Sequence, residues 1–305
     1  MFHILPFESL WSSRRLTDSV TVPSPILLKF WKMHGLGNDY IVVDNRDETM
    51  EEKSLGSLAK RLCNRRFSVG ADGLLIISES SIADTKMGIF NADGSEAEMC
   101  GNGIRCFAKY CYENGIVRKK EMKVETLAGV KALRLNTENR KVKDVQVNMG
   151  RAIFDREKIP MVGEGTFTDE DLKVDEQTFK ATCLSVGNPH CVIFVDGVEG
   201  FPLEAFGPKI ENHRMFPRRV NVEFAQVINK HELKVRVWER GVGETLACGT
   251  GACASAVAAK VLGKAGNECI VHLLGGDLSI QCGDEIHMTG PAEKVYTGEI
   301  CLEVT

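Results

Sequence analysis

The sequence predicts an α+β protein of two pseudo-symmetric lobes, each a mixed β-sheet or barrel wrapped around a central helix. Three observations lead to this prediction. The chain has 305 residues, about twice the length of an average domain. Each half contains several short strand-like runs and a long helical segment. An eight-residue motif occurs once in each half, where that helical segment begins.

The first half reads as short strands around a long helix. The run Tyr40–Val43 is rich in β-branched and aromatic residues, and Asp44-Asn45 then supplies a turn. Asn114-Gly115 ends the long helical pattern of this half. The predicted elements of the first half are strands at 40–43, 74–77, 86–91, 122–126, 130–135 and 145–149, with helices at 54–64 and 102–113.

The second half repeats this style, with predicted strands at 191–195, 220–227 and 233–238 and a helix at 250–262. Residues 252–259 of that helix read ACASAVAA, which is small and apolar on every side. This pattern is typical of a helix that is buried on every side, and a sheet wrapped around the helix would bury it in that way. The helix of the first half is similar but less extreme.

The repeated motif indicates a duplicated lobe. Residues 96–103 read EAEMCGNG, and residues 244–251 read ETLACGTG. Both place Glu four residues before Cys and follow the Cys with Gly-x-Gly at the opening of the long helix. Cys100 and Cys248 are 148 residues apart, which is about half of the chain.

Composition excludes several classes of protein. Hydrophobic residues make up 43% and charged residues 26%, which is the balance of a globular chain and not of a disordered one. No run approaches the roughly 18 apolar residues that a membrane helix needs. A net charge of −4 and an aromatic content of 7% do not favour a nucleic-acid surface. We therefore expect no nucleic-acid partner and no membrane partner.

The cysteines indicate the compartment. The chain has 11 of them, an odd number, without a Cys-x-x-Cys pair, and most lie inside apolar runs. This pattern favours a reducing compartment over a secreted disulfide scaffold, so we expect a cytoplasmic protein. Residues 1–29, here called the leader, lack the long apolar run of a secretory signal and are expected to be disordered. If the leader is a transit peptide, the alternative location is a plastid.

A Cys-Gly-x-Gly segment at a helix N-terminus suits proton transfer. The first N–H groups of a helix have no intrahelical partner and carry partial positive charge. We therefore expect the pKa of each thiol to lie below its free value of about 8.5. The glycines let an anion approach these N–H donors closely. The alternative interpretation is two buried thiols in two tight turns.

If the lobes face each other, one thiolate and one thiol would lie on opposite sides of the same carbon. The thiolate would remove a proton from one face and the thiol would deliver one to the other, which inverts a stereocentre. No lysine motif for pyridoxal phosphate and no cluster of metal ligands is evident, so we expect no cofactor and no metal.

Six motifs occur along the chain from about Phe30 to its end: MHGLGND (33–39), NADGS (91–95), MCGNGIRC (99–106), GNPH (187–190), ERG (239–241) and ACGTGA (247–252). In this order and combination they resemble the diaminopimelate epimerase family. The resemblance implies two similar lobes, with the last strand returning to the first: residues 30–144 plus 294–305, and residues 145–293. It also implies cofactor-free conversion of L,L-diaminopimelate to the meso form, on the route to lysine and peptidoglycan. A homodimer is left open.

The same resemblance assigns the site residues. Cys100 and Cys248 are implied to be the acid–base pair, with Cys100 deprotonating the L,L substrate, and His190 and Glu239 are implied to tune the thiols. The implied substrate-binding residues are Asn38, Asn91, Gly101, Asn102, Asn188, Asn221, Glu239, Arg240, Gly249 and Thr250. These types suit an amino acid, because an arginine binds a carboxylate with two N–H groups while amide and carboxylate oxygens accept from an ammonium.

Proline-racemase-like enzymes share the fold and the paired cysteines, but they usually have His where this chain has Asn102. Gly73 stands where some members of the resembled family have a substrate-contacting Gln, so it is left out of the site. We expect His34 to support the turn around Asn38. Two other classes stay open: a thiol hydrolase or acyl transferase that pairs one Cys with His190, and a binding module for the amino acid.

Overall fold

The structure, a computed structural model, describes residues 26–302. The helices are α1 (Glu52–Leu62), α2 (Gly101–Glu113), α3 (Leu203–Glu211) and α4 (Gly249–Val261), with a 3-10 turn, η1, at Arg156–Lys158. The strands of the first part of the chain are β1 (Ile26–Gly35), β2 (Asn38–Asp44), β3 (Gly73–Ser78), β4 (Thr85–Asn91), β5 (Glu121–Thr126), β6 (Gly129–Glu138), β7 (Lys141–Gly150), β8 (Phe167–Val174) and β9 (Gln177–Ser185). Those of the remainder are β10 (Pro189–Phe194), β11 (Asn221–Asn229), β12 (Glu232–Glu239), β13 (Gly243–Thr245), β14 (Glu268–Leu273), β15 (Gly276–Cys282), β16 (Ile286–Pro291) and β17 (Glu293–Leu302).

The predicted leader overlaps the first strand. Because β1 begins at Ile26, residues 26–29 of the leader belong to a strand. The rest of the leader, residues 1–25, lies outside the described residues, so the disorder expected there stays a prediction.

Two series of strands pair in the same pattern. In the first lobe β1 to β7 follow one another in sequence order, and the successive pairs are antiparallel, parallel, antiparallel, parallel, antiparallel and antiparallel. In the second lobe the series β9, β10, β11, β12, β14, β15 and β16 has the same six relations in the same order. The predicted α+β fold with two similar lobes is therefore confirmed.

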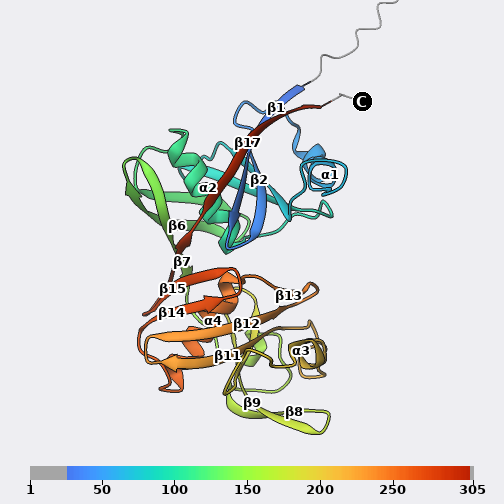
Figure 1. Cartoon of the computed structure of the whole chain (residues 1–305), viewed down its shortest axis with the longest axis vertical. Helices are drawn as coiled ribbons and strands as arrows, with labels where there is room; N and C mark the ends of the chain where they lie inside the picture. The colour runs from blue at the N-terminus through green and yellow to red at the C-terminus, as the bar shows by residue number, and fades with distance from the viewer. Residues whose placement is uncertain (1–25, 303–305) are drawn as a thin grey trace, which may run out of the picture. The chain divides into compact units, whose positions relative to one another are not determined.

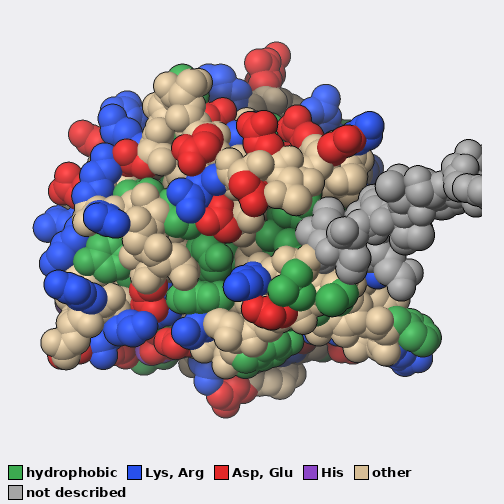
Figure 2. Space-filling model, turned by 90° about the horizontal axis from the view of Figure 1, so that it is seen from above, with side chains coloured by type: hydrophobic (Ala, Val, Ile, Leu, Met, Phe, Trp, Pro, Cys, Tyr) green, Lys and Arg blue, Asp and Glu red, His purple; other side chains and the backbone are tan. Residues whose placement is uncertain are grey.

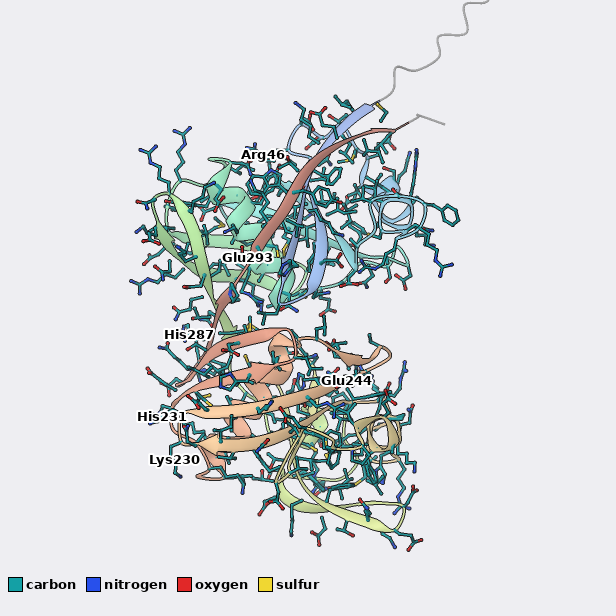
Figure 3. The ribbon with its side chains drawn as sticks, in the orientation of Figure 1. Arg46, Lys230, His231, Glu244, His287 and Glu293 are labelled. Atoms are coloured by element: carbon teal, nitrogen blue, oxygen red, sulfur yellow. The ribbon has the colours of Figure 1, made fainter. Side chains whose placement is uncertain are left out.

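Strand register supports the repeat residue by residue. Leu74 lies opposite Phe90 in the first lobe, and Val222 lies opposite Trp238 in the second. Phe90 and Trp238 each have a second antiparallel partner six residues later in the chain. Phe90 pairs with Glu96 in an isolated bridge, and Trp238 pairs with Glu244 of β13, which is labelled in Figure 3. Equivalent positions in these strands therefore differ by 148, as do the two cysteines of the repeated motif.

A helix occupies the centre of each lobe. Figure 1 shows α2 among the strands of the first lobe and α4 among those of the second. Every residue of α4 from Ala252 to Ala259 is buried, as its all-round apolar sequence predicted. The first 11 residues of α2, from Gly101 to Cys111, are also buried. The predicted helices at 102–113 and 250–262 are confirmed within one residue at each end.

Helix α3 was not predicted from the sequence. It contains both Gly207 and Pro208, which weaken a helical pattern. Its Gly207 lies under the indole of Trp238, where an added Cβ would come within 2.6 Å of the ring. Close packing against β12 therefore favours this helix where intrinsic preference does not.

The lobes share strand pairs, and residues 29–298 form one compact unit. Strand β7 of the first lobe pairs with β16 of the second, with Val147 opposite Met288. After β16 the chain continues into β17, which pairs with β1. After β7 it continues toward β8, which pairs with β9. The exact lobe boundaries expected above stay a prediction.

Figure 2 shows Lys and Arg side chains interspersed with Asp and Glu over the face that it displays, so no field of one sign dominates there. Among the described residues, no helix is both long enough and apolar enough to cross a membrane.

Candidate active site

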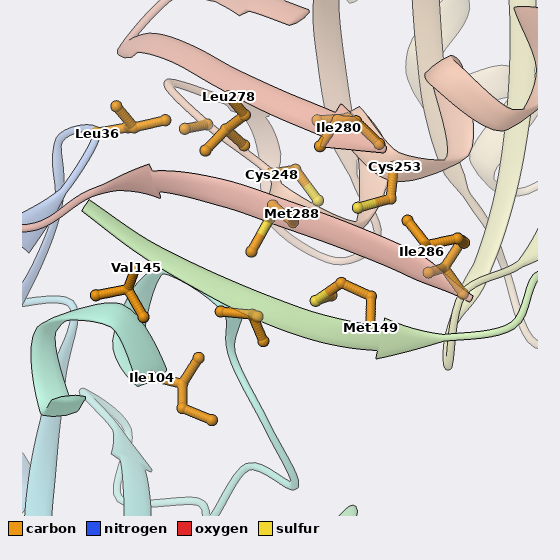
Figure 4. Close-up of a cluster of buried hydrophobic side chains, with 14 of the residues drawn as sticks. Leu36, Ile104, Val145, Met149, Cys248, Cys253, Leu278, Ile280, Ile286 and Met288 are labelled. Carbon is orange, nitrogen blue, oxygen red and sulfur yellow. The ribbon is translucent and has the colours of Figure 1, made fainter. Parts of the chain in front are cut away.

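The N-termini of α2 and α4 meet. Gly101 and Gly249 are their first residues, and a Cβ added at Gly101 would lie 3.9 Å from the Cα of Gly249. A Cβ added at Gly249 would lie 2.9 Å from the Sδ of Met288, the β16 residue shown beside Cys248 in Figure 4. The two helix starts are therefore in van der Waals range of each other, and Met288 packs against both of them. Asn102 donates from Nδ2 to the carbonyl of Ala247 at 3.1 Å, which ties the first turn of α2 to the residue before Cys248.

Cys100 precedes α2 as its N-cap, with extended backbone and a half-buried side chain. The hydroxyl of Tyr40 lies 2.9 Å from its Sγ. That hydroxyl also lies 2.6 Å from Oδ1 of Asn38, which is itself 3.8 Å from the sulfur. The Nδ2 group of Asn38 donates to Asp72 at 2.9 Å, and this bond directs the amide oxygen toward the tyrosine and the cysteine.

An ion-pair network holds the turn that carries Asn38. Nη2 of Arg65 lies 2.6 Å from Oδ1 of Asp39 and 2.7 Å from Oδ1 of Asp72, and Lys32 also pairs with Asp39. Burial by itself would raise the pKa of Asp39, but the hydrogen bonds from Arg65 and Lys32 hold it well below its usual range. The network therefore fixes the orientation of Asn38 beneath the thiol.

His34 supports the same turn, as predicted. Its Nδ1 accepts a hydrogen bond from the backbone N–H of Gly37 at 3.3 Å. Gly37 has a positive φ of 87° in this tight connection between β1 and β2, a conformation that favours glycine.

Cys248 is the N-cap of α4 and is buried. Its Sγ accepts from the N–H of Gly251 at 3.4 Å and lies 3.4 Å from the hydroxyl of Thr250. Burial raises the pKa of this thiol well above its ordinary value, and the carboxylates of Glu239 and Glu223 raise it further. The expectation of a lowered pKa is therefore wrong for Cys248, because desolvation and two carboxylates outweigh the helix N-terminus.

Glu239, at the end of β12, interacts electrostatically with the Cys248 thiol. Its Oε1 also accepts a hydrogen bond from the hydroxyl of Thr245 at 2.5 Å. Burial raises the pKa of Glu239 above its usual value. The family resemblance implied that Glu239 tunes a thiol, and the structure places it beside Cys248.

A fully buried pair lies beside the start of α4. Nδ1 of His190 is 2.7 Å from Oε1 of Glu223, and its Nε2 is 2.8 Å from Oδ1 of Asn188. A Cβ added at Gly251 would lie 2.7 Å from Oε1 of Glu223 and 3.4 Å from the Cβ of Cys248. The other carboxylate oxygen of Glu223, Oε2, is buried without a hydrogen-bond partner among residues 26–302. Such an oxygen is costly to bury, so Glu223 is a functional candidate.

Three other predicted residues make no hydrogen bond to either cysteine among the described residues, and two of them are exposed. Asn221 is buried, donates to the carbonyl of Pro189 at 2.9 Å and accepts from the backbone N–H of Arg240 at 2.9 Å. The Arg240 side chain is exposed and donates from Nη1 to the carbonyl of Arg218 at 3.3 Å. Asn91, at the end of β4, is exposed and donates to Ser95 at 3.0 Å. Neither the Asn91 nor the Arg240 side chain hydrogen-bonds to a cysteine in the part of the chain that the structure describes.

Sequence reasoning missed several residues of the site. Tyr40 was predicted only as a strand residue, although Gly37-Asn38-Asp39-Tyr40 and Gly187-Asn188-Pro189-His190 occupy corresponding positions at the starts of β2 and β10. Aligning these two segments would have placed Tyr40 where the second lobe has His190. Glu223 carried a second signal, since it is a charged residue among the mostly apolar residues of the predicted strand at 220–227.

Arg105 was also missed. Its side chain is fully buried, and it donates to the carbonyls of Pro291 and Gly101 and to Oδ1 of Asn102, at 3.0, 2.9 and 2.9 Å. It therefore joins the first turn of α2 to the end of β16. Burial lowers the pKa of its guanidinium. A buried cation of this kind favours negative charge nearby.

The arrangement gives no support to a Cys–His hydrolase built on neighbouring residues. His190 is bonded to Glu223 and Asn188, whereas Cys191 lies opposite Cys183 in the pairing of β10 with β9.

Known proteins with similar sequences share one family name. The sequence model described as "Diaminopimelate epimerase" matches residues 30–154 and 182–299. The diaminopimelate epimerase of Moorella thermoacetica is 51% identical over 280 residues, which cover 90% of this chain and 100% of that protein. The diaminopimelate epimerase of Methanococcus maripaludis is 48% identical over 277 residues, which cover 90% and 99% of the two chains.

Solved structures with low sequence identity share the fold alone. A PhzF-family phenazine biosynthesis protein from Bacillus anthracis superposes with a TM-score of 0.66 at 16% identity, covering 90% of this chain and 99% of that one. A hydroxyproline epimerase from Agrobacterium vitis, with bound trans-4-hydroxy-L-proline, superposes with a TM-score of 0.65 at 14% identity, covering 91% and 93%. Taken with the matches at about half identity over nearly the whole of each relative, these findings show that the chain belongs to the diaminopimelate epimerase family.

Proposed function

We propose that this chain interconverts L,L- and meso-diaminopimelate by transferring protons between the substrate α-carbon and two cysteines, without a cofactor. Membership of the family supports the reaction and the substrate, and makes the chain an isomerase. One observation supports the two-thiol mechanism above all. The helix N-termini that carry Cys100 and Cys248 lie side by side: a Cβ added at Gly101 would lie 3.9 Å from the Cα of Gly249.

The meeting of two helix N-termini suits an anion. Each N-terminus presents N–H donors without intrahelical partners and a partial positive charge, so two of them together favour a negative group between them. We propose that the α-carboxylate of the substrate occupies this place, held by the backbone of Gly101, Asn102, Gly249 and Thr250. The same donors would stabilise the charge that develops when the α-proton leaves, and they need no reorganisation to do so.

The surroundings of the two cysteines suggest their roles. Burial, Glu239 and Glu223 raise the pKa of Cys248, which keeps that thiol protonated at neutral pH and suits it to deliver a proton. Cys100 is less buried and lies beside a hydroxyl that can donate to a thiolate. We infer that Cys100 removes the α-proton of the L,L isomer while Cys248 protonates the opposite face, and that the roles reverse for the meso isomer.

Substrate recognition is proposed for the outer residues of the predicted set. The Arg240 guanidinium is exposed and makes one hydrogen bond to a backbone carbonyl, so its other N–H groups can donate to a carboxylate. The amide oxygens of Asn38, Asn91, Asn188 and Asn221 are proposed to accept from ammonium groups, together with Glu239. The amide oxygens of Asn38, Asn188 and Asn221 are already held in place by bonds within the protein, which preorganises them for this task.

The experiment is epimerisation of L,L-diaminopimelate in deuterated water, followed by NMR and chiral chromatography. Wild-type protein should incorporate deuterium at the α-carbon while forming the meso isomer. Cys100→Ala and Cys248→Ala should each slow epimerisation by about 10²-fold or more, because each removes a proton-transfer group. Cys253→Ala, which removes a fully buried thiol further along α4, is the matched control and should retain activity.

Either single variant working at the wild-type rate would rule out the two-thiol mechanism. A binding module would bind diaminopimelate without exchanging its α-proton. A thiol hydrolase would form a thioester and would tolerate loss of the second cysteine.

We also propose that the enzyme works in the cytoplasm, with a plastid as the alternative if the leader is a transit peptide. All 11 cysteines lie among the described residues and all are free thiols, which supports a reducing compartment. The homodimer left open above stays a prediction.

A further inference from the structure

We propose that Tyr40 is a positioning residue for Cys100, and that its hydroxyl donates a hydrogen bond to the sulfur whenever Cys100 is a thiolate. The inference rests on the proposed function, because it concerns how one of the two reacting sulfurs is held in its basic form. It starts from geometry: the phenolic oxygen is buried 2.9 Å from Sγ of Cys100 and 2.6 Å from Oδ1 of Asn38.

The hydroxyl has one proton and two acceptors within reach. Asn38 presents an oxygen, because its Nδ2 is committed to Asp72 at 2.9 Å. When Cys100 is a thiol, its S–H donates to the phenolic oxygen and the phenol donates to Asn38. When Cys100 loses its proton to solvent, or gains one from the substrate, the O–H turns toward the sulfur or back to Asn38. No covalent O–H bond breaks, so Tyr40 neither gains nor loses a proton in the cycle.

The environment keeps the phenol protonated throughout this exchange. Burial raises the pKa of Tyr40 well above its ordinary value, and the neighbouring Cys100 sulfur raises it further. Tyr40 therefore remains a neutral donor at any pH at which the enzyme works. A neutral donor can stabilise a thiolate without adding a charge that would compete with the substrate.

The pseudo-twofold relation shows why this position matters. Tyr40 lies opposite Gly73 in the pairing of β2 with β3, and His190 lies opposite Asn221 in the pairing of β10 with β11. Each donor group contacts the amide oxygen of the Asn two residues earlier, at 2.6 and 2.8 Å. The lobes thus place a phenol at one position and an imidazole paired with a buried carboxylate at the equivalent one. The two lobes therefore differ beside the two cysteines, and the proposed mechanism requires one of these cysteines to be a thiolate while the other is a thiol.

The test is Tyr40→Phe, which keeps the ring and removes the hydroxyl. Free enzyme is treated with iodoacetamide from about pH 6 to about pH 10, and labelling of the Cys100 peptide is followed by mass spectrometry. Because a hydrogen bond to a charged group is lost, the pH midpoint of labelling should move up by about one unit, and labelling near pH 7 should slow by roughly tenfold. Tyr110→Phe, in the buried face of α2, is the matched control and should label like wild type.

Kinetics separates this inference from the proposed function. In the pH profile of kcat/KM, the midpoint of the limb that rises with pH should shift to higher pH in Tyr40→Phe, by as much as the labelling midpoint does. It should stay in place in Tyr110→Phe. If wild-type protein fails to exchange the α-proton of diaminopimelate, the proposed function is wrong, whatever the labelling shows. If wild type exchanges that proton and Tyr40→Phe keeps both the midpoint and the kinetic limb, the role of Tyr40 is refuted.

A second measurement tests the same hydrogen bond if Tyr40→Phe folds poorly. Biosynthetic replacement of tyrosine by 3-fluorotyrosine makes the phenolic O–H more acidic and a stronger donor. The labelling midpoint of Cys100 should then move down in the wild-type sequence. No movement, or an upward one, would overturn the proposed hydrogen bond.

Discussion

Two glycines related by the internal repeat should respond in opposite ways to the same substitution. Gly103 and Gly251 are each the third residue of a central helix, α2 and α4. A Cβ added at Gly103 would lie 3.3 Å from Cδ2 of Leu75 and 3.4 Å from Cζ of Tyr40, which is only slightly tighter than ordinary contact. A Cβ added at Gly251 would lie 2.7 Å from Oε1 of Glu223, which is fully buried and bound to His190. Gly251→Ala should therefore be costly and Gly103→Ala should not.

The expected magnitudes follow from two opposing effects. Replacing Gly by Ala inside a helix is worth up to about 1 kcal/mol in backbone preference. Overpacking a buried site costs about 1–3 kcal/mol, and the upper part of that range applies where the obstructing group cannot move. We expect Gly103→Ala to be close to neutral and Gly251→Ala to lower the free energy of unfolding by about 2 kcal/mol. In a chain of this size that corresponds to a Tm about 3 °C lower.

Differential scanning fluorimetry of the two variants beside wild type measures this difference, and near-UV circular dichroism checks that each variant keeps its tertiary packing. Displacing Glu223 should also disturb Cys248, so Gly251→Ala should lose epimerase activity while Gly103→Ala loses much less. If the two variants melt within about 1 °C of each other, the buried carboxylate is not held as rigidly as its contacts indicate. The same result would remove the argument that Glu223 is fixed beside the thiol.

Three further predictions concern buried charge and thiols. Arg105→Lys should lower the Tm and the activity, because an ammonium cannot make the three directed hydrogen bonds of the buried guanidinium. Arg134→Lys, at an exposed position, is the control. Equal Tm and activity in the two variants would contradict this role of Arg105. Glu223→Gln should move the pH midpoint for alkylation of Cys248 down, since one of the carboxylates that raise the pKa of this thiol is gone; an upward shift would be inconsistent with that cause. Stability should fall as pH rises from about 8.5 to about 11, because the thiols of the unfolded chain lose protons first. Burial raises the pKa of Cys282 to about 11, so Cys282→Ala should make the fall in Tm shallower, and an unchanged slope would count against its contribution.

The central helices and their cysteines were predictable because local signals agreed. In α4 an all-round apolar segment, an N-terminal Gly-x-Gly and a terminal Gly263 favour the same helix, and tertiary packing reinforces them. Helix α3 was not predictable, because Gly207 and Pro208 oppose a helix and only contact with Trp238 explains it. The hairpin of β8 and β9 was missed for a related reason, since the polar run at 168–171 conceals its alternation.

The residues of the candidate site also fall into two groups, those that a local motif predicts and those that depend on tertiary contacts. Cys100 and Cys248 stand in a repeated motif at the start of a helix, so the sequence marks both as candidates, and their acid–base role is a proposal. The charge of Glu223 inside a strand could have drawn attention to it, but its place beside Cys248 could not be predicted, because its neighbours come from β10 and from the start of α4. The lowered pKa expected for Cys248 was wrong because desolvation depends on the surrounding side chains, which a local motif does not specify.

The strand pairing at the two ends of the repeat bears on how such a chain could have arisen. The first series of strands continues into β8, which completes the second series by pairing with β9, and the second series continues into β17, which pairs with β1. A half-length ancestor with the same pairing would have to exchange its last strand with a partner, so it would be a strand-swapped dimer. Each ancestral subunit would then supply one sulfur to a shared catalytic centre. Fusion of the two genes would free the subunits to diverge, giving one the phenol and the other the buried carboxylate and imidazole.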